Sequence, residues 1–433
     1  MSPCTIGLIG IAALILLLFA RIPVGFAMAI VGFTGFVQLV SLDAALSLLA
    51  RDVFSTFSSY GLTVIPLFIF MGQVSFHAGI SRRLYDTAYA FIGHRPGGLA
   101  MATVGACTAF GAICGSSPAT AATMATVALP EMKRYNYSME LATGAVASGG
   151  SLGMLIPPSV VFIVYGIMTE QSISKLFMAG ILPGLLIAGL FCLAISLSCR
   201  RHPELGPSGP PTSWRNRFQS LKGTGETLLI FGLVIGGLFV GFFTPTEAGA
   251  VGALCSIGIA LMGRNLTFAK LKISLFETTR TTCMVMIIVT GAVIFGHFLA
   301  VARIPYDLAG WVAGLPLPRF FTMMVIIAVY LIGGCFIDAL ALILLTVPIF
   351  YPVILALHYD PIWFGVIIVL VTQMGVISPP VGINVYVVKG VAPEIPLATI
   401  FRGVIPFLIA LIVGTIILIV IPQISIFLPG LMN

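Results

Sequence analysis

Two stretches of this chain repeat one arrangement of small, hydroxyl-bearing and proline residues that suits ion binding. Residues 105–166 and 327–388 align at a spacing of 222 positions and coincide at Pro130 and Pro352, Tyr137 and Tyr359, Gly153 and Gly375, and the pairs Pro157-Pro158 and Pro379-Pro380. Their flanks are almost wholly apolar, so free backbone N–H and C=O groups at the breaks need a cavity or packed protein beside them. Paired interrupted helices in two halves of a membrane chain indicate a solute-binding site.

The first break of the earlier stretch carries hydroxyl groups. Gly115, Ser116 and Ser117 precede Pro118, and Thr120 follows. A proline at a helix start would leave unpaired N–H groups that attract anions, while neighbouring carbonyl and hydroxyl oxygens would coordinate a hard cation such as sodium. The alternative is close helix packing, which Gly, Ser and Ala also serve.

The corresponding break of the later stretch carries a carboxylate. Asp338 aligns with Ser116 and follows Gly334 at the end of an apolar run. An ionisable group at mid-membrane is a functional hypothesis by default. Asp338 would hold a cation directly, relay a proton, or cap the helix that follows it.

A second break in each stretch contains a Pro-Pro pair. Proline removes helical hydrogen bonds and glycine permits non-helical backbone, so carbonyl oxygens become free there. Each break would complete an oxygen cage for a cation with one of the two earlier breaks. The alternative is a proline kink without a ligand. The candidate residues are Gly153, Pro157, Pro158 and Ser159 in the first stretch, and Gly375, Ser378, Pro379, Pro380, Gly382 and Asn384 in the second.

The composition is that of an integral membrane protein. Of the 433 residues, 59% are hydrophobic and 8% are charged, which lies outside the range of soluble domains. The net charge of +7 comes from Lys and Arg residues scattered between apolar runs instead of one basic face, so nucleic-acid binding is not expected. We expect an all-α, polytopic helical bundle in the lipid bilayer.

Apolar runs of about 20 residues predict the membrane spans. With the N-terminus outside, 17 of the 21 Lys and Arg residues are cytoplasmic, and only Arg51, Lys175, Arg303 and Arg319 remain outside. This positive-inside bias predicts that both chain termini are periplasmic. The predicted spans lie roughly at residues 4–20, 24–49, 54–79, 176–199, 226–244, 247–263, 282–302 and 403–428.

Under this orientation, residues 98–131 begin and end inside, whereas residues 319–357 begin and end outside. A helix of about 33 residues would be close to 50 Å long, which is too long for one span and suits two half-helices. We therefore expect re-entrant hairpins at about 98–131 and 319–357, each followed by a broken helix, at about 139–169 and 361–389. The chain would divide into inverted repeats at 1–199 and 224–433, joined by a cytoplasmic linker at 200–223.

Residues outside the two stretches are weaker candidates for chemistry. Thr244-Pro245-Thr246-Glu247 fits a capped helix start, so Glu247 is expected to be structural. No Walker loop, H-E-x-x-H or G-x-S-x-G motif occurs. A membrane enzyme that uses Asp338 or Glu247 as acid or base would lack a convincing second catalytic group. We expect neither enzyme activity nor an organic cofactor.

Six motifs in this order resemble those of the large membrane subunit of a tripartite ATP-independent periplasmic (TRAP) transporter, and the resemblance runs along essentially the whole chain. They are I-P-L-F at 65–68, G-S-S-P-A-T-A at 115–121, I-P-P-S at 156–159, P-T-E-A-G-A at 245–250, G-x-x-x-D at 334–338 and S-P-P-V-G at 378–382. Where the family often has Thr before the second Pro-Pro, this chain has Ser378. The tips and breaks are similar, more distantly, to those of ion-coupled dicarboxylate symporters with elevator-type folds.

The resemblance implies sodium-driven uptake of an organic acid anion, such as a four-carbon dicarboxylate or sialic acid, across a bacterial inner membrane. It implies two partners, which are a periplasmic substrate-binding protein and a small four-helix membrane subunit. Na⁺ would be the coupling ion, and the hairpin-bearing unit would slide against the remaining spans. The alternative is a stand-alone sodium/carboxylate symporter that needs no binding protein.

The resemblance also assigns roles to the candidate residues. One sodium region would comprise Ser116, Ser117, Thr120 and the Pro157-Pro158 break, and the other would comprise Asp338 and the break from Ser378 to Asn384. The substrate would lie between the two hairpin tips.

Overall fold

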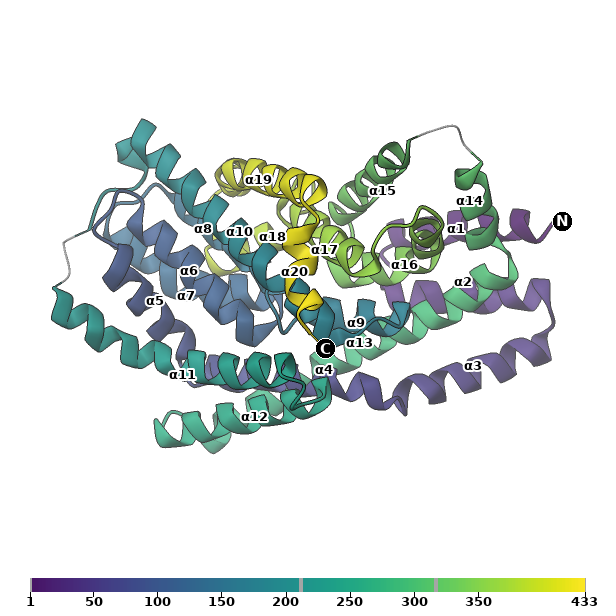
Figure 1. The fold of residues 1–433 in the computed structure, drawn as a ribbon, viewed down its shortest axis with the longest axis horizontal. Coiled ribbons are helices and arrows are strands. Elements are labelled where there is room, and N and C mark those ends of the chain that lie inside the picture. Colours follow the sequence, from purple (N-terminus) through teal and green to yellow (C-terminus); the bar gives the residue numbers. More distant parts are fainter. Residues whose placement is uncertain (1, 210–212, 315–317, 433) are drawn as a thin grey trace.

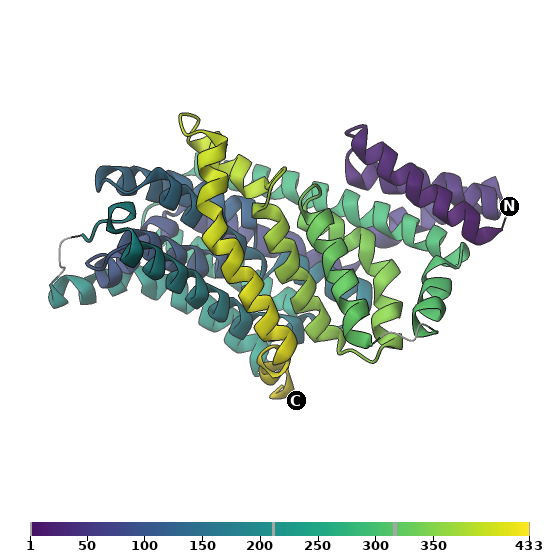
Figure 2. The ribbon, with the colours of Figure 1, turned by 90° about the horizontal axis from the view of Figure 1, so that it is seen from above.

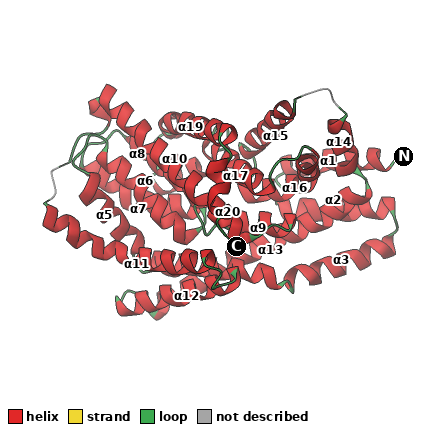
Figure 3. Ribbon diagram, in the orientation of Figure 1, coloured by secondary structure: helices red, strands yellow, loops and turns green. Residues whose placement is uncertain are grey.

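The computed structural model describes residues 2–209, 213–314 and 318–432, and the regular elements in these ranges are helices (Figure 3). The middle of the expected linker and the outermost residues of the two expected repeats therefore lie outside the described residues. The prediction of an all-α fold is confirmed. Six helical segments among the described residues are long and apolar enough to cross a membrane, and one of them, Tyr60–His77, combines two consecutive helices.

The molecule is elongated, with the N-terminus at one end and the C-terminus near the middle (Figures 1 and 2). The first half of the chain forms α1 (Pro3–Phe19), α2 (Val24–Leu39), α3 (Leu42–Phe57), η1 (Tyr60–Thr63), α4 (Val64–His77), α5 (Ile80–Ile92), α6 (Gly98–Cys114), α7 (Ser117–Arg134), α8 (Met139–Ser151), η2 (Leu152–Met154), α9 (Val160–Thr169) and α10 (Ile173–Arg201). The second half forms η3 (Pro203–Leu205), α11 (Trp214–Phe239), α12 (Pro245–Met262), α13 (Phe268–Val301), α14 (Ile304–Ala313), α15 (Arg319–Gly334), α16 (Ala339–Ala356), α17 (Pro361–Ile377), α18 (Ile383–Val391), α19 (Leu397–Val420) and α20 (Gln423–Gly430).

Each expected hairpin is a pair of helices that meet at the expected tip. α6 and α7 are separated by Gly115 and Ser116, and Gly115 has φ 62°, a left-handed conformation that favours glycine. Pro118 stands in the first turn of α7, where an N–H would have no helical partner. In the second hairpin, Asp338 lies between α15 and α16 and caps α16 with its side chain. Their depth in a bilayer stays a prediction.

Each expected broken helix is also two helices with an irregular segment between them. α8 passes through η2 to the Pro157-Pro158 pair before Ser159 caps α9. α17 ends before the Pro379-Pro380 pair, and Gly382, with φ 59°, precedes α18. Both Pro-Pro peptide bonds are cis. Proline supplies no N–H, so the helical ladder stops in both halves at corresponding positions.

The helices pack as two groups. In the hairpin group, α6 packs on α8, α15 on α17, α7 on α18, α9 on α16, and α19 on both α8 and α10. In the outer group, α2 packs on α13, α4 on both α12 and α13, and α11 on α12. The two groups meet where α4 contacts α6 and where α13 contacts α16, and the short helices α5 and α14 connect them along the chain. Figure 2 shows α19 crossing the hairpin group.

The helix contacts of the two halves follow one pattern. Adding 222 to the numbers of α7, α8 and α9 leads into α16, α17 and α18. The contact of α7 with α18 accordingly has a counterpart between α16 and α9, and that of α6 with α8 has one between α15 and α17. The correspondence of the two halves supports a repeat, whereas their opposite orientation in a membrane stays a prediction.

Two predicted spans in the first half have wrong boundaries. The sequence suggested spans at 24–49 and 54–79, but α2 ends at Leu39 and three shorter elements, α3, η1 and α4, follow. The chain breaks at Ser41, whose side chain accepts a hydrogen bond from the Ala44 N–H and starts α3. An N-cap of this kind ends an apolar run that hydropathy alone reads as continuous.

Boundaries in the second half also differ from the predicted spans. Helix α11 begins at Trp214, capped by Ser213, so much of the expected linker at 200–223 is helical, and α10 reaches Arg201. Helix α13 begins at Phe268, capped by Thr267, and has 34 residues, instead of the 282–302 predicted. The predicted span at 403–428 is two helices, α19 and α20, that separate before Pro422. Hydropathy marks the apolar part of a helix and misses the polar turns that extend it.

Candidate functional site

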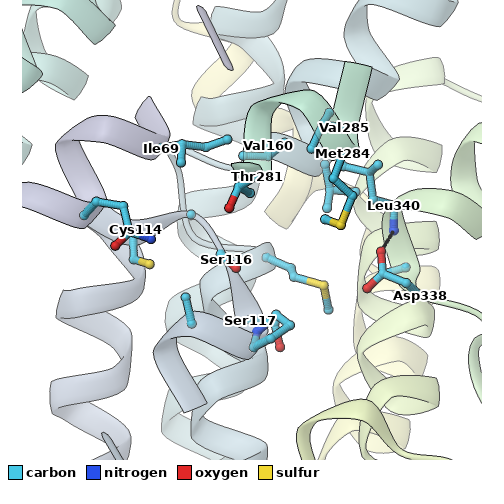
Figure 4. A pocket seen from close by; sticks show the side chains of 17 residues that line it. Ile69, Cys114, Ser116, Ser117, Val160, Thr281, Met284, Val285, Asp338 and Leu340 are labelled. Carbon is cyan, nitrogen blue, oxygen red and sulfur yellow. Dashed lines mark hydrogen bonds between the residues drawn. The ribbon is translucent and has the colours of Figure 1, made fainter. Parts of the chain in front are cut away.

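A cavity of about 140 Å³ lies where the two hairpin tips meet the outer group. Figure 4 shows Ser116 and Ser117 on one side, Asp338 on the other, and Thr281 and Met284 of α13 above them. The cavity is lined by Ile69, Gln73, Cys114, Gly115, Ser116, Ser117, Pro118, Ala119, Met154, Val160, Val161, Thr281, Met284, Val285, Asp338, Ala339 and Leu340. Residues more than 160 positions apart therefore form one chamber.

The tip of the first hairpin presents a free hydroxyl. Ser116 is the N-cap of α7 and its side chain makes no capping hydrogen bond. The Ser116 carbonyl accepts from the Thr120 hydroxyl at 2.8 Å. Because α7 starts at the cavity, the unpaired N–H groups of its first turn and the positive end of its dipole lie beside the chamber.

The tip of the second hairpin presents a carboxylate. Asp338 Oδ2 accepts a hydrogen bond of 3.1 Å from the Leu340 N–H, so Asp338 caps α16 (Figure 4). Capping was one of the three predicted roles, and the same side chain also lines the cavity. A carboxylate at a helix N-terminus interacts favourably with the dipole and keeps further lone pairs for a cation.

The charge balance of the chamber is unusual for an anion site. Among its lining residues none is Lys, Arg or His, and the one ionisable carboxyl is Asp338. An organic anion in this place would be attracted by the starts of α7 and α16 and repelled by Asp338. A cation bound beside Asp338 would remove that repulsion.

The first Pro-Pro break packs directly against the first hairpin tip. A Cβ added to Gly153 would lie 2.9 Å from Thr120 Oγ1 and 3.1 Å from the Ser116 carbonyl oxygen. A Cβ added to Gly115 would meet the carbonyl oxygen of Pro158. The fully buried Ser159 donates its hydroxyl to the Met154 carbonyl. The backbones of the tip and the break thus lie in contact, whereas the first cation cage stays a prediction.

The second Pro-Pro break packs against the second hairpin. A Cβ added to Gly375 would lie 2.7 Å from the Gly334 carbonyl oxygen, so these two backbones touch. Ser378 donates its hydroxyl to the Met374 carbonyl at 2.6 Å. This placement mirrors that of the first break.

Asn384 is hydrogen-bonded to the first hairpin instead of to Asp338, the residue with which it was grouped in the sequence analysis. The resemblance placed it with Asp338, but its Oδ1 accepts a 2.9 Å hydrogen bond from the Ser117 hydroxyl of the first hairpin, and its Nδ2 donates to the Ala147 carbonyl at 2.8 Å. The reason is that α18 packs on α7 and α8, across the two halves. The sequence spacing could not show this crossing.

Few of the predicted residues line the chamber itself. Gly115, Ser116, Ser117 and Asp338 do, whereas the others do not line it, and Pro379 and Pro380 are exposed. These others are Thr120, Gly153, Pro157, Pro158, Ser159, Gly334, Gly375, Ser378, Pro379, Pro380, Gly382 and Asn384.

Three polar residues at or near the site were missed. Gln73 of α4 and Thr281 of α13 line the cavity from the outer group. Gln373 of α17, fully buried, donates from Nε2 to the Ser151 carbonyl at 2.8 Å. The available signal was a polar side chain inside an apolar run, which marks function in membrane segments.

The start of α12 is as predicted. Thr244 accepts from the Glu247 N–H at 3.3 Å, and Glu247 Oε2 accepts from the Thr244 N–H at 2.8 Å. This reciprocal pair is a capping box. Glu247 is therefore structural, and it does not line the cavity at the hairpin tips.

The long apolar helices, the paired hairpins and the chamber between their tips define a multi-pass membrane transporter. Residues 11–424 match the model of the family described as the DctM component of the tripartite ATP-independent periplasmic transporter. The chain belongs to this family, and the resemblance seen in its motifs is confirmed. The family's description makes it one component of a tripartite system.

Characterised relatives cover nearly the whole chain. It is 40% identical, over 91% of its length and 92% of the relative's, to the C4-dicarboxylate TRAP transporter large permease protein DctM of Pseudomonas aeruginosa. It is 33% identical, over 96% of both chains, to the sialic acid TRAP transporter large permease protein SiaM of Vibrio cholerae. These relatives are named as transporter permeases and not as enzymes.

Solved structures share the fold. The YdaH transporter of Alcanivorax borkumensis superimposes with a TM-score of 0.55 at 14% identity, covering 90% of this chain and 89% of that one. MtrF of Neisseria gonorrhoeae gives 0.53 at 13% identity, covering 96% and 95%. At these identities the likeness concerns the fold alone.

Proposed function

We propose that this protein takes up an organic acid anion together with sodium, as the large membrane subunit of a binding-protein-dependent transporter. The observation that carries the proposal is the chamber at the hairpin tips, where two helix starts, the free Ser116 hydroxyl and the Asp338 carboxylate meet. The helix starts attract an anion, and the oxygens attract a hard cation.

The need for a cation follows from the charges. Asp338 would repel a carboxylate substrate in a chamber whose lining has no basic side chain. A sodium ion near Asp338 reverses this effect, so ion and substrate bind better together than alone. Such mutual dependence is the thermodynamic basis of coupled transport.

Two cation regions support this coupling. The first comprises Ser116, Ser117, Thr120, Gly153 and the Pro157-Pro158 break, which pack on one another behind the first tip. The second comprises Asp338, Gly334 and the break from Gly375 to Gly382. Hydroxyl and carbonyl oxygens of this kind suit sodium, and interrupted helices at mid-membrane commonly supply them. Asn384 joins the first region through Ser117 instead of the second.

The names of the relatives support the substrate class. C4-dicarboxylates and sialic acid, named for two relatives, both carry carboxylate groups. A site built from helix starts and hydroxyls recognises the carboxylate and leaves the rest of the molecule to the surrounding walls. An organic acid anion is therefore the proposed cargo.

The arrangement of helices supports a sliding movement. The two groups are each packed internally and are joined along the chain by α5 and α14. In the proposed cycle, the hairpin group carries the occupied chamber across the bilayer against the outer group. The protein would reside in a bacterial inner membrane with both termini periplasmic, as the distribution of Lys and Arg residues favours.

The partners follow from the tripartite family. A small four-helix membrane subunit would complete the membrane complex, and a periplasmic protein would deliver the substrate. Reconstitution of the chain with its small subunit in liposomes tests the whole proposal through uptake of labelled succinate. The arms are an inward sodium gradient, the binding protein, both, and neither.

The outcomes of this uptake experiment distinguish the proposal from its alternatives. Uptake that needs sodium and binding protein together is the expected result. Uptake with sodium alone would replace the proposal by the stand-alone symporter. Uptake that persists unchanged without sodium would overturn the coupling.

A further inference from the structure

A second, larger cavity lies between the outer group and the hairpin group, away from the hairpin tips. Its volume is about 1010 Å³, and it is bounded by the end of α3 with η1, by α9, α13 and α14, and by α16. It shares no lining residue with the chamber at the tips. The charge distribution that puts Arg51 and Arg303 outside also puts this cavity on the periplasmic side.

A His-Asp pair stands in the wall of this cavity. The Asp52 carboxylate, with 3% of its side chain exposed, accepts a 2.7 Å hydrogen bond from His297 Nδ1, while 42% of the His297 side chain is exposed. A carboxylate on one ring nitrogen fixes the ring's tautomer and orientation. The other nitrogen, Nε2, is then available to a ligand, and it donates to an anion when both ring nitrogens carry protons.

Arg303 supplies a permanent positive charge to the same wall. It follows the end of α13, six positions after His297, and both residues line the cavity. Its guanidinium lies 5.2 Å from the centroid of the Tyr306 ring. Among the described residues Arg303 forms no ion pair. An arginine without an acidic partner, held over an aromatic ring, suits a carboxylate ligand.

The part of the cavity formed by α9 carries an acidic residue instead of basic ones. Of the residues that line this cavity, Glu170 is the one carboxylate, and it follows α9 in the hairpin group. His297 and Arg303 belong to the outer group. The residues able to bind an anion therefore lie on α13 and directly after it, whereas the acid follows α9.

We infer that the α13 wall of this cavity is a second anion site, which binds the carboxylate of an organic acid through His297 and Arg303 before the anion reaches the hairpin tips. The ligand class rests on the proposed function. The proposed contacts are N–H donors of His297 and Arg303, so binding of the anion here does not require sodium. It belongs to the outer group, so it stays in place while the hairpin group moves.

Equilibrium binding of labelled succinate to the purified full chain, in buffer without sodium, tests the site. We expect binding that weakens as ionic strength rises, because Arg303 is solvent-exposed. His297→Asn keeps a donor for Asp52 while it removes Nε2, and Arg303→Gln removes the charge. Each is expected to weaken this binding about tenfold, or about 1.4 kcal/mol. Arg319→Gln, which removes a positive charge outside the cavity, is the control and is expected to have no effect.

The outcomes separate this inference from the proposed function. Sodium-independent binding that is absent, or is unchanged in His297→Asn and Arg303→Gln, overturns the second site. The double variant Ser116→Ala/Asp338→Asn should keep sodium-independent binding while it loses sodium-driven uptake. Loss of both in that variant would mean that the anion binds only at the tips, which also overturns it. A further outcome is that the wild-type protein binds succinate with the expected pattern and yet shows no sodium-driven uptake. That result would contradict the proposed function and would support the second anion site.

Discussion

Gln373 donates a 2.8 Å hydrogen bond from Nε2 to the backbone carbonyl oxygen of Ser151, the residue 222 positions before it. The two residues are equivalents in the repeated stretches, so this bond joins the broken helix of one half to the broken helix of the other. Gln373 is fully buried, and its Oε1 has no protein partner among the described residues. One side chain therefore links α8 to α17, just before the break in each half.

Replacement of Gln373 by Met is expected to destabilise the protein by about 1–3 kcal/mol, because the buried Ser151 carbonyl would lose its partner. Thermal unfolding in detergent, followed by size-exclusion chromatography, measures the effect. Ser151→Ala is the matched control, since it keeps the backbone carbonyl and loses only the hydroxyl bond to Ser148. Equal losses in the two variants would contradict the role of Gln373.

The chain from Ser117 through Asn384 to Ala147 is expected to act as a unit. Asn384 both accepts from Ser117 and donates to Ala147, and all three sites are buried. Ser117→Ala and Asn384→Ala should therefore be non-additive in thermal stability, with a coupling of about 1 kcal/mol. A double variant whose loss equals the sum of the single losses would show that the hydrogen bond contributes nothing.

Position 375 is expected to require glycine, because its backbone touches the backbone of Gly334. A Cβ at this position would meet the carbonyl oxygen of Gly334 at 2.7 Å, and backbone cannot move aside as a side chain does. Gly375→Ala should cost about 1–3 kcal/mol and lower uptake. Gly390→Ala is the control, because nothing lies within 4 Å of its added Cβ. Both variants are compared by yield of monodisperse protein and by uptake in liposomes.

Ser116→Ala and Asp338→Asn are expected to raise the sodium concentration for half-maximal uptake by about tenfold each, because each removes a cation ligand worth about 1.4 kcal/mol. The measurement is initial uptake rate against sodium concentration in liposomes. Glu247→Gln also removes a carboxylate from a helix start, but it lies outside the chamber. An equal shift in Glu247→Gln would mean that helix capping, and not ion binding, explains the effect.

Helix α5 is expected to show a pH effect at Asp86. Burial raises the pKa of Asp86, Arg82 opposes the rise and Glu131 adds to it. A raised pKa in the folded state gives stability that is present below the ordinary value near 3.8 and is lost as pH rises through the raised value. Asp86→Asn should therefore raise the melting temperature at pH 7 and leave it nearly unchanged near pH 4.

Melting curves between pH 4 and pH 8 check this sign. Glu394→Gln, a change at an exposed carboxyl in the segment after α18, is the control. A lower melting temperature for Asp86→Asn at pH 7 would show that attraction to Arg82 outweighs burial.

Much of the local structure followed from the sequence. Helices break at Gly115 with Pro118 and at the two Pro-Pro pairs, because glycine permits left-handed backbone and a Pro-Pro pair lacks two N–H groups and disfavours helical backbone before each proline. The helices accordingly break at the predicted residues, whereas re-entry into a membrane stays a prediction. The capping box at Thr244 and Glu247 is another local pattern, and it was predicted in the same way.

Boundaries were predicted less well, because hydropathy does not detect caps. Ser41 divides an apolar run between α2 and α3, and Ser213 and Thr267 extend helices into polar sequence. Each boundary depends on one side-chain hydrogen bond that competes with continuing the helix.

The sequence by itself determined that this is a helical membrane protein with two matched stretches, each broken by glycine and proline at positions that free backbone groups. Only the tertiary structure decided which of these breaks meet. It placed Asn384 against Ser117 of the other half, brought Gln73 and Thr281 to the chamber, and joined Gln373 to Ser151. The physical reason is that a break is a property of neighbouring residues, whereas a contact between distant segments depends on how whole helices pack.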